Sequence, residues 1–108
     1  MSQDALQIVL CTAPPNEASG LARAVVEERL AACVNIIPSI TSVYRWEGEV
    51  HEDGEALLVI KTTAGGLDAL QERLTALHSY DVPEVLALPV SGGSKPYADW
   101  VREALKIE

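Results

Sequence analysis

Two short runs of the sequence are apolar at every position, and they constrain the fold more than any other feature. The runs are ALLVI at residues 56–60 and VLAL at residues 85–88. A strand with one face in water alternates apolar and polar residues, whereas a strand covered on both faces does not. Both runs therefore predict strands that are buried on both sides. A chain of 108 residues has to find that cover within itself or in another subunit.

The segments around these runs predict a simple order of elements. Apolar and β-branched stretches predict strands at 5–11, 33–46, 50–63 and 82–90. Helical spacing of apolar residues predicts helices at 16–30, with Asn16 as the cap, at 67–77, and after Ser94. Pro38 predicts an edge strand or a bulge, and Glu47-Gly48 predicts a hairpin turn. The order β-α-β-β-α-β plus a terminal helix predicts one α+β domain over residues 1–108, with the ferredoxin-like fold.

This fold leaves one face of the sheet without sufficient cover. Its two main helices pack on the same face, and the short terminal helix can cover only part of the other. The strand runs nevertheless require burial on both faces, and the long hairpin from residue 33 to 63 has free edges. The sequence therefore predicts a homo-oligomer in which another copy covers the remaining face.

Charge and composition limit the classes of partner. The net charge is −8, and the eight Lys and Arg residues are scattered without a run. Binding to nucleic acid or to an anionic membrane is therefore not expected. The surplus of carboxylates fits weak cation binding and equally fits an ordinary acidic surface. The N-terminus lacks the basic segment of a signal peptide, and no apolar stretch reaches the roughly 20 residues of a membrane span, so a cytoplasmic protein is predicted.

Four side chains of the types that bind metals can be placed in this topology. Cys11, His78 and His51 are expected at one end of the sheet, and Cys33 at the other, roughly 25 Å from Cys11. Thiolate and imidazole groups suit copper or zinc. No two of these residues have the sequence spacing of metal ligands, however. Each residue also has an explanation without a metal. The two cysteines can pack as small apolar residues, His78 can stabilise the C-terminus of a helix, and His51 can be a solvated residue of the hairpin.

Two further charged residues lie at strand ends. Lys61 closes one buried strand and Glu84 precedes another, so they could pair at a subunit contact or line a polar pocket. The motifs GxSxG, HExxH and GxGxxG and the phosphate-binding loop are absent from the sequence. No catalytic activity is expected on this basis.

Several ordered blocks of the sequence resemble one family. They are CTAPPNEA (11–18), ERLAACVNIIPSITSVYRWEGEV (28–50), EALLVIKTT (55–63), HSYDVPEVLALPV (78–90) and YADW (97–100). Together they resemble the CutA family of divalent-cation tolerance proteins. The resemblance implies a homotrimer of ferredoxin-like subunits, similar in architecture to the PII signalling proteins, and a role in tolerance of copper and other divalent cations.

The resemblance also implies a set of metal ligands. Carried over by position, these are Cys11, Cys33 and His78. The family often has His-Pro-Tyr-Glu where this chain has His-Ser-Tyr-Asp at 78–81, and the second main helix lacks the further cysteine of some members. We therefore expect a cytoplasmic homotrimer that binds copper or another divalent cation weakly. The alternatives are a PII-like sensor, which would bind an anionic or nucleotide-like ligand between subunits through Lys61 and aromatic side chains, and a structural hub for partner proteins.

Overall fold

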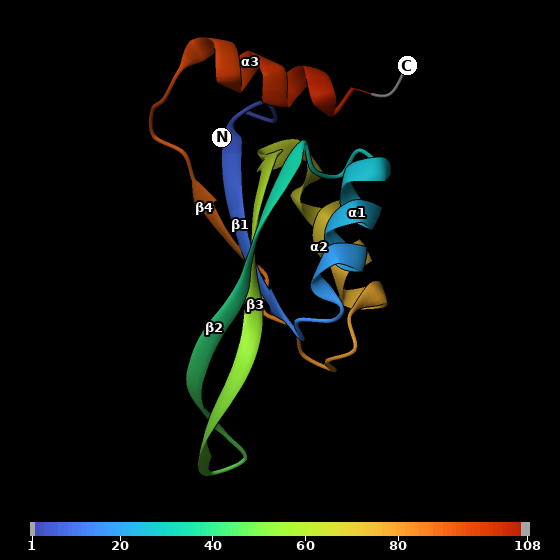
Figure 1. Ribbon diagram of the computed structural model, residues 1–108. Helices are drawn as coiled ribbons and strands as arrows, with labels where there is room; N and C mark the ends of the chain where they lie inside the picture. The colour runs from blue at the N-terminus through green and yellow to red at the C-terminus, as the bar shows by residue number, and fades with distance from the viewer. Residues whose placement is uncertain (1, 107–108) are drawn as a thin grey trace.

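The computed structural model describes residues 2–106 and confirms the predicted order of elements (Figure 1). The strands are β1 (Leu6–Ala13), β2 (Cys33–Trp46), β3 (Glu49–Thr63) and β4 (Leu86–Pro89). The helices are α1 (Ala18–Glu27), the single 3₁₀ turn η1 (Ala64–Gly66), α2 (Leu67–Leu77) and α3 (Lys95–Ala104). None of the helices within residues 2–106 is long and apolar enough to cross a membrane.

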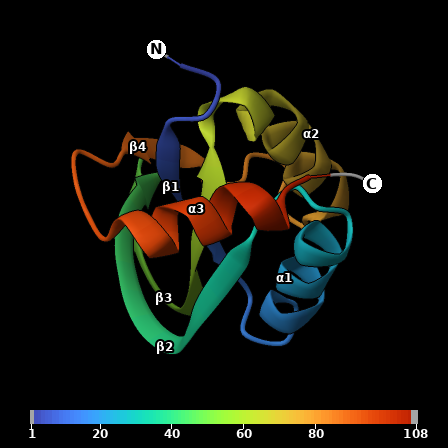
Figure 2. The same cartoon turned by 90° about the horizontal axis from the view of Figure 1, so that it is seen from above.

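The four strands form one antiparallel sheet in the order β2-β3-β1-β4, as the ferredoxin-like prediction requires. Helices α1 and α2 lie side by side on the same face of this sheet (Figures 1 and 2). Along β1, every second residue is buried, and the buried set includes Val9 and Cys11. These side chains pack with Val25 of α1 and with Leu70 and Leu74 of α2. The hydrophobic core therefore lies between the sheet and the two helices.

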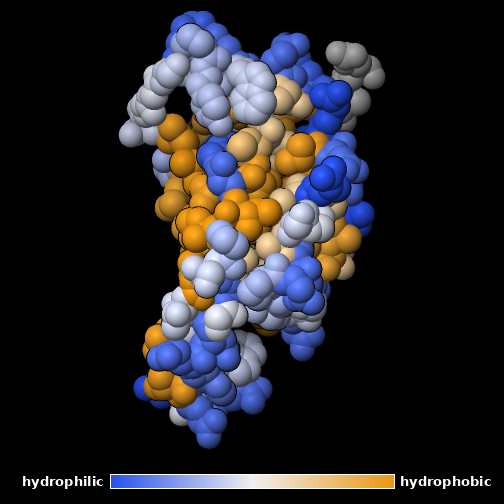
Figure 3. Space-filling model, viewed as in Figure 1, coloured by the Kyte–Doolittle hydropathy of each residue, from blue (hydrophilic) through white to orange (hydrophobic). Residues whose placement is uncertain are grey.

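The opposite face of the sheet, which we call the open face, is also apolar. The strand register places Ile8 and Leu10 of β1 beside Leu88 and Leu86 of β4 on this face. Leu86 is 58% exposed and Leu88 is 49% exposed, although both belong to a run that the sequence predicts to be covered on both sides. Figure 3 shows apolar residues gathered below α3 and above the hydrophilic tip of the hairpin. A single chain therefore leaves this face without cover.

The β2–β3 hairpin extends well beyond the helices and gives the molecule its long axis of 44 Å (Figure 1). Glu47 and Gly48 join the strands with φ angles of 50° and 81°. Positive φ at both central residues matches the right-handed twist of a two-residue hairpin. The register shifts between Ile37 and Ile40, so the bulge predicted from Pro38 is confirmed. The sheet order also makes β2 an edge strand.

Two element boundaries differ from the prediction. The first helix begins at Ala18, and no side chain caps it, so the predicted cap at Asn16 is wrong. It ends at Glu27 because Arg29 adopts a left-handed φ of 59°, which α-helical backbone cannot accommodate. The last strand forms only at Leu86–Pro89 rather than over residues 82–90. Pro83 lacks a backbone N–H, so it cannot donate a hydrogen bond to a neighbouring strand.

Helix α3 crosses the end of the sheet at which β1 begins (Figures 1 and 2). The backbone N–H of Tyr97 donates to the Ser94 hydroxyl at 3.4 Å, which confirms the predicted cap. The Arg102 side chain donates to the carbonyl of Asp4 at 2.9 Å, and Arg29 donates to the carbonyl of Ala104 at 3.1 Å. These two arginines attach α3 to the segment before β1 and to the loop after α1.

Candidate functional site

Polar and aromatic side chains line a cavity that runs from the end of β1 along the outer half of the β2–β3 hairpin. This hairpin cavity has a volume of about 610 Å³. Strands β1, β2 and β3 contribute to its wall, and so does the 80–84 segment that follows α2. Its aromatic and acidic lining residues are Tyr44, Trp46, Glu55, Tyr80, Asp81 and Glu84. A cavity of this volume falls in the usual range of small-molecule sites.

Two tyrosines of the wall are held by carboxylates. The Tyr80 hydroxyl donates to Glu55 at 2.8 Å, and Glu55 is 8% exposed. The Tyr44 hydroxyl donates to Asp53. Burial raises the pKa of Tyr80, and the hydrogen bond to Glu55 raises it further. Both phenols are therefore neutral donors at physiological pH, and their rings are held in place.

His78 supports the same wall from behind. Its Nε2 lies 2.8 Å from the carbonyl oxygen of Thr12, and a carbonyl can only accept, so Nε2 carries the proton and donates. Its Nδ1 accepts from the backbone N–H of Tyr80 at 3.1 Å. The imidazole is 8% exposed and tilted against the Tyr80 ring, with centroids 4.6 Å apart. In this arrangement a neutral His78 positions Tyr80, and neither ring nitrogen has a free lone pair.

Cys11 lies in the hydrophobic core and faces the helices. Its side chain is fully buried, and its only hydrogen bond within residues 2–106 is a long one to the carbonyl of Thr12, at 3.7 Å. Burial raises the pKa of its thiol to about 12, and the charges of Glu84 and Glu55 add to this effect. The thiolate that binds metals is therefore strongly disfavoured at Cys11.

Cys33 lies on the open face, next to Lys61 in the strand register. Burial raises the pKa of Tyr97, and the neighbouring Cys33 thiol raises it further, so α3 brings this phenol against the cysteine. The Lys61 ammonium contacts the Asn35 side chain. Lys61 does not line the hairpin cavity, whereas Glu84 does. The pairing of Lys61 with Glu84 at a subunit contact stays a prediction.

The structure does not bring the predicted metal ligands together within one chain. Cys33 of β2 pairs with Lys61 of β3, which pairs with Ile8 of β1. Ile8 lies three residues before Cys11, and β3 separates β2 from β1. The two Cα atoms are therefore about 14 Å apart rather than the predicted 25 Å, which is still too far for a shared ion. His51 stacks on Tyr44 in the hairpin, at 5.5 Å between ring centroids. Within residues 2–106, no group of three or more His, Cys, Asp or Glu residues is placed to hold a metal ion.

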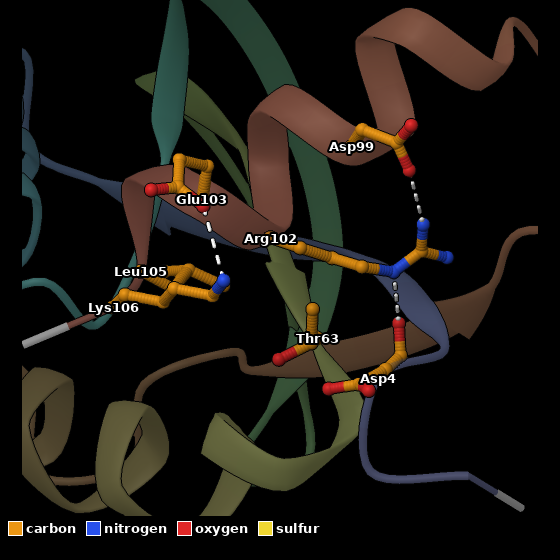
Figure 4. Close-up of a pocket in the computed structure, with 7 residues that line it drawn as sticks. All are labelled: Asp4, Thr63, Asp99, Arg102, Glu103, Leu105 and Lys106. Carbon is orange, nitrogen blue, oxygen red and sulfur yellow. Dashed lines mark hydrogen bonds and ion pairs between the residues drawn. The ribbon is translucent and has the colours of Figure 1, made fainter.

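A second cavity, of about 510 Å³, lies beneath α3 (Figure 4). Both cationic side chains of its lining, Arg102 and Lys106, are in ion pairs. Arg102 contacts Asp99 at 3.3 Å and the Asp4 carbonyl at 2.9 Å, and Lys106 contacts Glu103 at 3.1 Å. The two ion pairs lie within the C-terminal segment, and the bond to Asp4 attaches α3 to the residues before β1, so we assign the second cavity a structural role.

Sequence reasoning did not find the hairpin cavity. The sequence suggested aromatic side chains only as partners of Lys61 in a site for an anionic ligand, and it gave Glu55 no individual role. One available signal was Glu55 itself, a carboxylate directly before the buried run 56–60. A buried carboxylate needs a hydrogen-bond donor, and the Tyr80 phenol provides it.

Comparisons with known proteins agree with this fold. The family model described as CutA1 divalent ion tolerance protein matches residues 7–104. The divalent-cation tolerance protein CutA of Thermus thermophilus is 56% identical over 98 residues, which are 90% of this chain and 95% of that protein.

Two solved structures extend the comparison to three dimensions. The divalent cation tolerance protein from Thermus thermophilus is 54% identical, with a TM-score of 0.89, covering 92% of this chain and 97% of that chain. A PII-like protein CutA from Nostoc sp. PCC 7120 is 33% identical, with a TM-score of 0.88, covering 94% of this chain and 99% of that chain. By both sequence and structure, this chain belongs to the CutA1 divalent ion tolerance family.

Proposed function

We propose that the protein is a cytoplasmic homotrimer of single-domain chains that takes part in tolerance of divalent cations, copper among them, and that binds these ions weakly. Family membership supports the role in cation tolerance. The observation that carries the assembly is the open face, on which Leu86 and Leu88 stand exposed beside Ile8 and Leu10. Apolar surface of this extent is normally covered by a partner. The proposed activity is binding rather than catalysis.

The geometry of the three candidate ligands explains why binding would be weak. His78 has to give up one of its two hydrogen bonds to free a nitrogen, at a cost of about 1 kcal/mol. Because of its raised pKa, Cys11 forms a thiolate at a cost about 4 kcal/mol higher than an ordinary thiol. Cys33 is partly exposed on the open face, where another copy of the chain can approach it. A copper site would therefore draw mainly on Cys33 and take further ligands from neighbouring copies.

Native mass spectrometry with and without stoichiometric copper, under reducing conditions, tests this proposal. We expect a trimer that takes up one copper ion per chain. Cys33→Ser should reduce this uptake most, and His78→Ala should reduce it less. Cys11→Ala should reduce it least, because burial raises the pKa of this thiol. A trimer that takes up no copper, or an indefinite number of ions, would remove the metal site, and a monomer would contradict the assembly.

The hairpin cavity favours a second function, that of a small-molecule sensor. Its volume of about 610 Å³ fits a metabolite-sized ligand, and it lies where β1, β2 and β3 meet the segment after α2. The register places Thr12, Tyr44 and Glu55 of its wall on the open face of the sheet. The cavity would therefore border the proposed contact between subunits, where ligand binding can influence the assembly. Ligand-dependent thermal stabilisation of the trimer would support this function.

A further inference from the structure

We propose that the hairpin cavity binds a small organic cation of the ammonium class, held between its aromatic side chains and its carboxylates. The inference rests on the sensor function proposed above and specifies the charge of the ligand. It reverses the expectation from the sequence, which was an anionic or nucleotide-like ligand bound with the help of Lys61.

The charged residues of the wall are all negative. Glu55, Asp81 and Glu84 line the cavity, and no Lys, Arg or His side chain of the described residues does. None of these carboxylates takes part in an ion pair within residues 2–106. The effect of this charge reaches Cys11 behind the wall, where Glu84 and Glu55 raise the pKa of the thiol. An anionic ligand would be repelled here, whereas a cation would neutralise charge that the chain leaves unpaired.

Glu55 is the residue most clearly built for a ligand. Its side chain belongs to a residue that is only 8% exposed, and its Oε2 accepts from Tyr80. Its Oε1 makes no hydrogen bond within the described part of the chain. Within residues 2–106, every side-chain oxygen or nitrogen that is fully shielded from solvent has a hydrogen-bond partner. Because Oε1 has none, it is not fully shielded from solvent. Glu55 lines the cavity, and this carboxylate oxygen is left without a partner among the described residues.

The aromatic side chains suit an organic cation. Trp46 is 50% exposed at the wall, and the rings of Tyr44 and Tyr80 are fixed by their hydrogen bonds to Asp53 and Glu55. The face of an aromatic ring attracts a cation, most strongly for tryptophan, and contributes about 0.5–2 kcal/mol. A carboxylate beside several aromatic rings is the arrangement that recognises substituted ammonium groups.

The spacing of the carboxylates separates an organic cation from a metal ion. A bound Ca²⁺ or Mg²⁺ needs several oxygens within about 2.6 Å of one point. No three acidic side chains in the described part of the chain converge in that way. An ammonium group with its carbon substituents is larger, and it can meet one carboxylate directly while its methyl groups contact the aromatic rings. The dispersed carboxylates therefore favour the organic cation.

Isothermal titration calorimetry of the intact protein with choline tests the proposal. The matched control ligand is the uncharged isostere of choline, in which carbon replaces the quaternary nitrogen. We expect choline to bind and the isostere not to bind. Glu84→Gln and Trp46→Leu should each weaken choline binding by about three- to tenfold. Glu103→Gln, at the cavity beneath α3, is the control variant and should leave choline binding unchanged.

Other results would overturn the proposal in distinguishable ways. Equal binding of choline and its isostere would show that the cavity selects apolar shape rather than positive charge. If inorganic phosphate or a nucleotide binds and choline does not, the ligand is an anion rather than a cation, and the sensor function is retained. Binding of copper or magnesium that Glu84→Gln weakens, without choline binding, would make the cavity an inorganic site. Binding of none of these probes by an intact trimer would remove both the inference and the sensor function at this cavity.

Discussion

At the scale of single residues, hydrogen bonding and burial decide which candidate side chains are available for chemistry. His78 and Cys11 have the right chemical types for a copper site, yet one is engaged at both ring nitrogens and the other lies in the core. Glu55 belongs to no recognised sequence motif, yet it lines a cavity and has one carboxylate oxygen without a hydrogen-bond partner among the described residues. The accessible lone pairs therefore lie on the carboxylates and on Cys33.

The raised pKa of Cys11 predicts a specific loss of stability at alkaline pH. A thiol whose pKa rises from 9.0 in the unfolded chain to about 12 in the folded protein stabilises the fold fully below pH 9. This stabilisation is lost as the pH rises from 9 to 12. Between pH 8 and 10.5, the free energy of unfolding of the unsubstituted protein should fall by about 2 kcal/mol more than that of Cys11→Ala. Urea denaturation at the two pH values measures this difference, and parallel changes would contradict it.

Tyr80→Phe should separate the hydrogen bond of Tyr80 from the packing of its ring. The substitution leaves the buried Glu55 without its donor, so the free energy of unfolding should fall by about 1–2 kcal/mol at neutral pH. Tyr97→Phe removes a phenol that is 45% exposed, and it should cost less. Equal losses in the two variants, measured by chemical denaturation, would mean that the contact between Tyr80 and Glu55 contributes little.

Local patterns in the sequence were sufficient for the elements but not for the cavity. Pro38, the Glu47-Gly48 turn and the Ser94 cap act over a few residues, so their structural effects could be predicted. The contact between Tyr80 and Glu55 joins residues 25 positions apart and depends on how β3 packs against the segment after α2. The direction of Cys11 was predictable in principle, because side chains alternate along β1 and Val9 faces the core.

At the scale of elements, the β2–β3 hairpin carries much of what is specific to this molecule. It extends past the helices, and it contributes Tyr44 and Trp46 to the hairpin cavity. Its geometry depends on two local features, the bulge near Pro38 and the tight turn at its tip. The turn requires positive φ angles, which residues with a Cβ atom adopt only with strain.

Gly48→Ala should destabilise the protein through this turn. Gly48 has a φ of 81°, where an added Cβ costs about 1 kcal/mol. The matched control is Gly54→Ala in β3, where φ lies outside the left-handed range and the added Cβ would meet no atom within 4 Å. The control should be neutral or slightly stabilising. Thermal denaturation of both variants tests the prediction, and an equal effect of the two substitutions would contradict it.

At the scale of the whole molecule, the two faces of the sheet have unequal cover. Helices α1 and α2 complete one face, whereas the open face is left with half-exposed aliphatic side chains on β4. Helix α3 is attached across one end of the sheet and covers only part of the remainder (Figure 2). The proposed trimer supplies the missing cover, and the proposed ligand cavity would lie at its margin.

Leu88→Lys should prevent this assembly. Leu88 is 49% exposed on the open face, and covering a lysine ammonium there costs several kcal/mol. Leu77→Lys is the control, because Leu77 is 37% exposed at the end of α2, on the helix side of the sheet. Sedimentation equilibrium should find a monomer for Leu88→Lys and a trimer for Leu77→Lys. A trimer in both variants would place the subunit contact elsewhere.

The bulge near Pro38 has a consequence for how this chain tolerates deletions. Before the bulge, odd-numbered residues of β2 such as Ile37 share the open face with Leu57. Beyond it, the even-numbered Ser42 and Tyr44 pair with residues of that same face. Loss of a single codon at Ser39 would remove the extra residue and restore regular alternation, so the later side chains of β2 would keep both their β3 partners and their face. Such a deletion would leave the reading frame, the helices and the direction of Tyr44 intact, so the bulge makes this position of β2 tolerant of the loss of one residue.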